Sequence, residues 1–229
     1  MNKNYLNVKN IFFDLDNTLI FDEDTDSEYY KEALSNLGYD ENNFYKIYVA
    51  IDEYEKSLTE ENCFYNEKEM LEFINKSLDE DYRIELIAEL RKSIEENWIK
   101  RPLIKEDLLE KLSKKYNLYV YTNYFGASQA KRLENIGYKK YFKKVFGADE
   151  YGCKPYKKNF ETILNEICSR PEDCIMIGDT KKMDILAANN IGMQSILFDY
   201  DGKRDNKAIE LKDYIVIKNM NDLDKILDI

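Results

Sequence analysis

Histidine is absent from the 229 residues of the chain, and this absence removes several kinds of active site. A Ser-His-Asp triad, a Cys-His pair and a zinc ion held by histidine are all impossible. Acid–base chemistry near neutral pH therefore depends on carboxylates, lysine, cysteine or tyrosine. The four cysteines form no CxxC pair, which is typical of reduced thiols that pack in the core of a cytosolic protein.

Long apolar runs and an excess of positive charge are also missing. No apolar segment approaches membrane-spanning length and residues 1–10 lack the apolar core of a signal peptide, so we expect a cytoplasmic protein without a membrane partner. The chain has 34 Lys and Arg against 45 Asp and Glu, which gives a net charge of −11, and its basic residues do not form a basic stripe along the sequence. This pattern argues against a nucleic-acid polymer as partner. We expect a monomer or a weak homodimer.

Short apolar runs that end in polar residues are the main fold signal. Most of them lack alternation, as strands buried on both faces do, and helical segments near 104–116, 127–137, 156–169 and 181–190 separate them. The pattern predicts a Rossmann-like, three-layer α/β/α core with a mainly parallel sheet, formed by residues 1–20 and 102–229. The runs are 11–13, 118–121, 144–146, 174–177, 195–198 and 214–217.

Residues 21–101 have a different pattern and are predicted to form an inserted, all-helical cap subdomain. Tyr30, Ala33, Leu34 and Leu37 recur at helical spacing, and Gly38 follows them as a stop signal. Further stripes lie at 44–58 and 87–98, where Trp98 is the last member, and the residues at 66 and 69 resemble a capping box. The many aromatic residues of this segment are expected to be mainly core, with a minority available to stack on a nucleobase or a sugar.

The polar residues that follow the apolar runs are the candidates for a functional site. In an open parallel sheet, ligands bind beyond the carboxyl ends of the strands, so these side chains should gather in one crevice. Four carboxylates in one crevice repel one another unless a cation joins them, and hard oxygen ligands favour Mg²⁺. A lysine and a threonine alongside would hold an anionic oxygen, which together describes a phosphate site. The candidates are Asp14, Asp16, Thr18, Thr122, Asn123, Lys154, Asp179 and Asp184.

Each of these signals has a plain structural alternative when it is taken alone. Residues 14–18 (DLDNT) suit a strand-to-loop turn, and Thr122 with Asn123 suits a helix cap. Lys154 suits the surface, and Asp179 or Asp184 suits a helix N-cap. The four signals nevertheless occur in order, each at the end of its own apolar run, and this joint occurrence favours the functional interpretation.

The sequence resembles the haloacid dehalogenase superfamily of hydrolases on these same residues. Residues 14–18 resemble the first motif of the family, and 122–123 resemble the second. Lys154-Pro155, with Phe160 five residues after the proline, is similar to the third motif, 178–184 to the fourth, and 187–193 to its continuation. One departure is Leu103-Ile104, where many relatives carry a proline-glycine pair after the cap. Since true dehalogenases lack the second aspartate of the first motif, the presence of Asp16 favours phosphoryl transfer.

The resemblance implies a Mg²⁺-dependent phosphatase for a small phosphorylated metabolite, such as a nucleotide or a sugar phosphate, with an aspartyl-phosphate intermediate. It implies that Asp14 is the nucleophile and Asp16 the general acid and base. Asp14, the backbone carbonyl of Asp16, Asp179 and Asp184 would hold the metal. Thr122 and Lys154 would act in catalysis, and the substrate-binding residues would be Thr18, Thr122, Asn123 and Lys154.

Two other functions share the same motifs. A phosphomutase would return the phosphoryl group to a sugar instead of to water. A regulatory phosphate-binding protein would keep the fold without turnover. The intact set of carboxylates with Lys154 argues against the silent protein.

Overall fold

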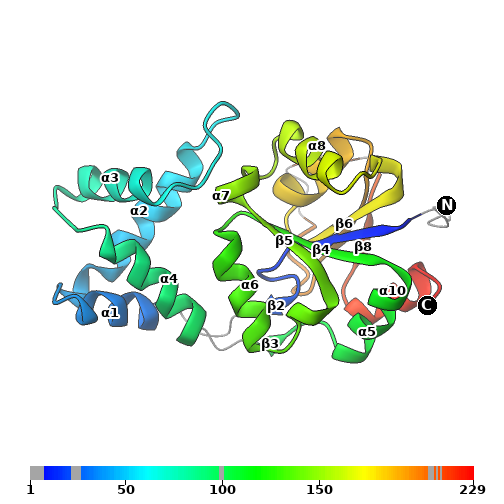
Figure 1. Cartoon of the computed structure of the whole chain (residues 1–229), viewed down its shortest axis with the longest axis horizontal. Coiled ribbons are helices and arrows are strands. Elements are labelled where there is room, and N and C mark those ends of the chain that lie inside the picture. Colours follow the sequence, from blue (N-terminus) through cyan, green and yellow to red (C-terminus); the bar gives the residue numbers. More distant parts are fainter. Residues whose placement is uncertain (1–7, 22–26, 98–100, 206–208, 210, 212) are drawn as a thin grey trace.

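The computed structural model of the chain describes residues 8–21, 27–97, 101–205, 209, 211 and 213–229. Six parallel strands form the central sheet in the order β5-β4-β1-β6-β7-β8 (Figure 1). Each strand coincides with one of the predicted apolar runs, so the predicted parallel sheet is confirmed. The bounds are β1 Asn10–Phe13, β4 Asn117–Thr122, β5 Phe142–Gly147, β6 Cys174–Gly178, β7 Gln194–Phe198 and β8 Ile215–Ile217.

Successive residues of β1 enter apolar clusters on opposite faces of the sheet, as the pleat of a strand requires. Ile11 and Phe13 belong to one cluster, and Phe12 belongs to the other, where its ring stacks on Tyr119 with centroids 5.1 Å apart. Helices α5, α6 and α10 complete the first cluster, and α8 and α9 complete the second. The predicted three-layer core is therefore confirmed. These helices are α5 Glu106–Lys115, α6 Gly126–Asn135, α8 Lys157–Glu166, α9 Ala187–Asn190 and α10 Leu223–Ile226.

Shorter helical turns connect the elements of this core. One of them is a π-helical turn, η4, which begins shortly after the end of β6 and leads into α9. π-Helical turns are rare in proteins, and those that do occur often lie at functional sites. The turns are η2 Lys139–Tyr141, α7 Ala148–Tyr151, η3 Pro171–Asp173, η4 Lys181–Leu186 and η5 Met220–Asp222.

Four helices form a separate layer beside the sheet domain (Figure 1, left), and they have an apolar cluster of their own. At the end of α1 the main chain of Tyr39 bonds back to Leu34 at 2.9 Å across Gly38, whose φ of +74° suits glycine. The sequence predicted this stop, whereas Trp98 lies outside the described residues. The elements are α1 Ser27–Asn36, η1 Glu41–Asn43, α2 Phe44–Ser57, α3 Glu67–Leu78 and α4 Glu85–Asn97.

The predicted capping box of α3 is only half correct. The Asn66 side chain accepts hydrogen bonds from the main-chain N–H groups of Lys68 and Glu69, as expected for an N-cap. In a full capping box the Glu69 carboxylate would accept a bond from the Asn66 N–H. Here the Asn66 N–H donates to the Tyr54 hydroxyl at 3.2 Å, and the Glu69 carboxylate accepts from the Asn62 side chain. A residue from α2 therefore performs half of the capping.

The cap helices contact the core directly at several points. Arg91 of α4 donates from Nε to the Ser128 hydroxyl of α6 at 3.0 Å, and the Cys153 N–H donates to the Cys63 carbonyl at 2.8 Å. A two-residue antiparallel pair, β2 Ile20–Phe21 with β3 Arg101–Pro102, joins the two sides of the insertion. In the described part of the chain, no helix combines the length and the apolarity needed to cross a bilayer.

Candidate active site

Three adjacent central strands supply the first members of the site. Asp14 follows β1, Thr122 ends β4 and Asp179 follows β6, and these strands run parallel in the order β4-β1-β6. The register pairs Phe13 with both Val120 and Ile177, so the three carboxyl ends lie at the same edge of the sheet. The strands that follow β1 in the chain lie on both sides of it, with β4 and β5 on one side and β6, β7 and β8 on the other. In open parallel sheets, ligands bind at the carboxyl ends of the strands where the strand order reverses in this way.

Lys154 reaches this edge from the loop between α7 and α8 and joins two of the carboxylates. Its Nζ lies 2.7 Å from Asp14 Oδ1 and 2.6 Å from Asp184 Oδ1, and its side chain is only 2% exposed. Burial by itself would lower the pKa of this lysine, but the charges of Asp14 and Asp184 raise it above its ordinary value. The ammonium group is therefore charged at neutral pH and is a fixed cation for an anionic ligand.

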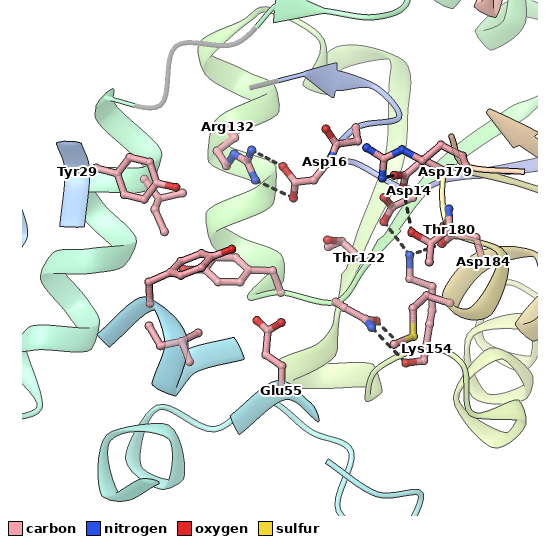
Figure 2. A pocket seen from close by; sticks show the side chains of 18 of the residues that line it. Asp14, Asp16, Tyr29, Glu55, Thr122, Arg132, Lys154, Asp179, Thr180 and Asp184 are labelled. Carbon is pink, nitrogen blue, oxygen red and sulfur yellow. Dashed lines mark hydrogen bonds and ion pairs between the residues drawn. The ribbon is translucent and has the colours of Figure 1, made fainter. Parts of the chain in front are cut away.

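Asp14, Asp179 and Asp184 each offer one oxygen, and these three oxygens lie within 4.8 Å of one another (Figure 2). Lys154 supplies one positive charge, and Arg204, which follows β7, supplies a second through a bond of 2.8 Å to Asp179. Three carboxylates therefore face two cations, which leaves the cluster one positive charge short. A close group of carboxylate oxygens is the ligand set that Mg²⁺ prefers, so the donor chemistry of these residues suits that ion.

The electrostatics of the cluster show the same deficit of cation. Burial, followed by the neighbouring carboxylates, raises the pKa of Asp14 well above its ordinary value even though Lys154 lowers it. Burial and the charge of Asp184 raise the pKa of Asp179 to about 7. Both carboxyl groups therefore hold a proton more readily than they would in water, and a divalent cation would displace these protons.

We expect the metal-free protein to lose stability as the pH rises from about 4 to about 7. In that range the unfolded chain has released the proton of a carboxyl group with an ordinary pKa of 3.8, while folded Asp179, whose pKa is raised to about 7, still binds it. Ionising Asp179 therefore penalises only the folded state, and the raised pKa of Asp14 acts in the same direction. Thermal unfolding should give a Tm that is lower by several degrees at about pH 8 than at about pH 5.

Mg²⁺ should raise the Tm more at about pH 8 than at about pH 5, because ionised carboxylates bind the metal without releasing protons. Na⁺ at equal ionic strength is the control for general screening. A metal-free Tm that increases between the two pH values, with no added effect of Mg²⁺ at the higher one, would contradict this interpretation.

Gly178 at the end of β6 allows Asp184 to approach the strand. A Cβ atom at position 178 would overlap the Asp184 carboxyl group, whose Oδ2 accepts a bond from the Thr180 N–H at 3.0 Å. We expect Gly178→Ala to displace Asp184 and to weaken Mg²⁺ binding by about 10- to 100-fold. Calorimetric titration with Mg²⁺ measures this, and unchanged affinity in a folded variant would show that the close approach is unimportant.

Asp16 is held by a polar pair on α6 that the sequence analysis did not identify. The Arg132 guanidinium donates to both oxygens of Asp16, at 2.5 and 3.1 Å (Figure 2). Gln129 Nε2 donates to Asp16 Oδ2 at 3.0 Å. The Arg132 side chain is 1% exposed, whereas that of Asp16 is 37% exposed and faces the cavity. The only sequence signal was the presence of Gln and Arg, three residues apart, on the buried face of this helix.

Thr122 and Asn123 use their side chains in different ways. Thr122 Oγ1 accepts from Gln129 Nε2 at 3.0 Å, which leaves the hydroxyl proton for an acceptor in the cavity. The Asn123 amide bonds to the main chain of Lys154 at both ends, at 2.7 and 3.1 Å. Asn123 thus positions the loop that carries Lys154, and it also lines the cavity, so its predicted contact with substrate stays a prediction.

Thr18 is the one predicted residue that the structure does not bring to the others. It is 0% exposed and is not part of the cavity wall. The tight turn at Asn17, with φ of +58°, lies between Asp16 and Thr18. A substrate in the cavity therefore has no access to the Thr18 side chain, and the prediction that it binds substrate is not supported.

The site opens into a cavity of about 460 Å³ between the core and the cap helices. Figure 2 shows Asp14, Asp16 and Lys154 on one side of this space and Tyr29 with Glu55 on the other. Arg204 also lines the cavity. The sequence did not predict Arg204 as a site residue, although it lies in the polar segment that follows β7 and ligands bind beyond the carboxyl ends of parallel strands.

Comparisons with known proteins find a family model, curated relatives and solved structures that are similar to this chain. The family model of haloacid dehalogenase-like hydrolases matches residues 8–192. Glyceraldehyde 3-phosphate phosphatase of Methanothermobacter thermautotrophicus is 33% identical over 124 residues, which cover 52% of this chain and 55% of that protein. N-acylneuraminate-9-phosphatase of Rattus norvegicus is 26% identical over 204 residues, which cover 83% and 82%. Of the first three curated relatives, the chain spans 55%, 41% and 38%, about half of their length or less.

A solved structure shows the same fold over nearly the whole chain. The HAD-hydrolase YfnB of Bacillus subtilis, in a structure bound to magnesium, superposes with a TM-score of 0.73 at 20% identity. The superposition covers 97% of this chain and 99% of that one, so the likeness includes the helical insertion as well as the sheet.

Proposed function

Because the chain belongs to the haloacid dehalogenase-like hydrolases, we propose that it is a Mg²⁺-dependent phosphatase that acts through an aspartyl-phosphate on Asp14. Its substrate would be a small phosphorylated metabolite, a nucleotide or a sugar phosphate. One observation carries the proposal: oxygens of Asp14, Asp179 and Asp184 lie within 4.8 Å of one another beside the buried Lys154 ammonium. The two curated relatives reported above, from Methanothermobacter thermautotrophicus and Rattus norvegicus, are named phosphatases, which favours water over a sugar as the final acceptor.

Asp14 would be the nucleophile. Within the described residues its side-chain hydrogen bond comes from Lys154 to Oδ1, so Oδ2 would be left for phosphorus or for a cation. The attack forms a bond between this carboxylate and phosphorus and breaks the ester bond to the leaving oxygen. Lys154 and the Thr122 hydroxyl would hold the phosphoryl oxygens during this in-line transfer.

Asp16 would move the proton. Its carboxyl group reaches the cavity, where it would protonate the leaving oxygen as the ester bond breaks. It would then take a proton from the water that attacks phosphorus, which releases phosphate and restores Asp14. The Arg132 and Gln129 contacts fix the orientation of Asp16, and the chain has no histidine to replace it.

The metal would be held by Asp14, the backbone carbonyl of Asp16 and Asp179, with Asp184 bound directly or through a water molecule. When bound, Mg²⁺ offsets negative charge on the phosphoryl oxygens. Asp184 is already oriented by Lys154 and by the Thr180 N–H, which suits a residue that fixes its neighbours.

The direct test of this function is phosphate release from p-nitrophenyl phosphate by the purified chain. We expect turnover that requires Mg²⁺, stops with a chelator and returns when excess Mg²⁺ is added. A folded, Mg²⁺-loaded sample without any turnover would overturn the proposal.

A further inference from the structure

We propose that the cap side of the cavity selects phosphate esters whose leaving group is uncharged, carries a flat ring and offers N–H donors, as a nucleoside 5′-monophosphate does, and that Glu55 makes this selection. This inference rests on the phosphatase function proposed above, and it narrows the substrate class.

The cap-side wall is built from aromatic and aliphatic side chains around one carboxylate. Tyr48, Ile51 and Glu55 lie at i, i+3 and i+7 of α2, so one face of this helix lines the cavity. Tyr29 and Tyr30 of α1, and Tyr124 beyond the end of β4, bring further rings to the wall. Figure 2 shows Tyr29 and Glu55 across the cavity from Asp14 and Lys154. Tyr29 and Tyr30 are buried and close the wall from behind, whereas Tyr48 is 39% exposed and offers ring surface on which a base can stack.

The charges of the wall disfavour a leaving group with a second anion. Three cations line the cavity, and each already contacts a carboxylate: Lys154 with Asp14 and Asp184, Arg132 with Asp16, and Arg204 with Asp179. On the cap side, Glu55 is the only charged side chain among the described lining residues. A carboxylate or second phosphate on the leaving group would therefore meet a like charge with no cation to offset it.

Glu55 has the bonding capacity to hold an N–H group. Its side chain is exposed and lines the cavity. A carboxylate has about four acceptor positions, so most of them remain for a ligand. Burial raises the pKa of Glu55 to about 7, so its repulsion of a second anion is complete only above that pH, and a bond from a base would stabilise the ionised form. A simple sugar phosphate offers neither the ring nor the N–H group.

The experiment measures affinity as well as turnover, so that the two proposals can fail separately. Calorimetry with Mg²⁺ and the Asp14→Asn protein compares nucleoside 5′-monophosphates, glucose 6-phosphate and 3-phosphoglycerate. We expect at least one nucleotide to bind about tenfold or more tightly than both other compounds. The wild-type kcat/KM values should follow the same order.

Two variants assign the selection to Glu55. Glu55→Gln should reduce the ratio of nucleotide to 3-phosphoglycerate affinity by about tenfold or more, and Glu55→Lys should reduce it further by tightening 3-phosphoglycerate binding. A merely structural role would not produce that gain. Glu53→Gln, on an exposed side chain of the same helix, is the matched control and should leave the ratio unchanged.

Equal affinity for nucleotides and 3-phosphoglycerate, or an unchanged ratio in both Glu55 variants, would overturn the inference. Absence of turnover with p-nitrophenyl phosphate would instead overturn the phosphatase proposal, while a nucleotide preference in calorimetry would still support the assignment of the cap-side wall.

Discussion

Asp14→Asn should reduce phosphate release by at least about 1,000-fold while the protein stays folded. The amide could not form the proposed aspartyl-phosphate, and it would also remove an anionic oxygen from the proposed metal ligands. The loss should be similar for alkyl and aryl phosphates, since both require the same nucleophile.

The fold should survive this change because the carboxylate that is removed carries an unfavourable charge. Burial and the charges of Asp179 and Asp184 raise the pKa of Asp14, and Lys154 keeps its bond to Asp184 at 2.6 Å. We expect a metal-free Tm within a few degrees of the wild type. Asp107→Asn, at an exposed aspartate of α5, is the control and should retain full activity. Turnover above about one-hundredth of wild type in Asp14→Asn would remove the assignment of the nucleophile.

Asp16→Asn should give a loss that depends on the leaving group. An alkyl oxygen needs a proton as it leaves, so hydrolysis of an alkyl phosphate should slow by about 100- to 10,000-fold. Nitrophenolate leaves without help, so p-nitrophenyl phosphate should still transfer its phosphoryl group to Asp14. The water step then lacks its base, and rapid mixing should show a burst of about one nitrophenol per protein before slow turnover.

The same substitution should also lower stability, which must be separated from the kinetic effect. The neutral amide introduced at position 16 would leave the charge of Arg132, whose side chain is 1% exposed, with a weaker partner. We expect a cost of about 1–3 kcal/mol, less than for a fully buried pair, because Asp16 is 37% exposed and the amide still offers an acceptor. Activity is therefore compared per folded molecule, measured by circular dichroism. Equal losses for both substrate types without a burst would contradict the role of Asp16.

The core of this fold was predictable because its signals are local. A strand buried on both faces must be apolar along its length, and all six runs became strands of one parallel sheet. The carboxyl ends of such strands share an edge, so the sequence already indicated that Asp14, Thr122 and Asp179 would meet. The two-residue strands β2 and β3 were missed because two residues carry no periodicity.

The missed site residues depend on contacts between distant parts of the chain. Arg132 lies 116 positions from Asp16, and helical spacing shows only that its side chain faces inward. Glu55 continues the inner face of α2, but nothing local shows that this face lines a cavity instead of core. The Asn123 amide suits a helix cap equally well in sequence, and only the folded loop at Lys154 reveals its partner.

A crystal structure of the chain with Mg²⁺ and beryllium trifluoride tests the central claim most directly, because this anion adds to a carboxylate as a phosphoryl group would. The account predicts beryllium bonded to an oxygen of Asp14, with Mg²⁺ at about 2.0–2.1 Å from oxygens of Asp14 and Asp179. Lys154 and Thr122 should contact the fluorine atoms. Beryllium fluoride bound elsewhere, or Mg²⁺ that does not contact both aspartates, would contradict it.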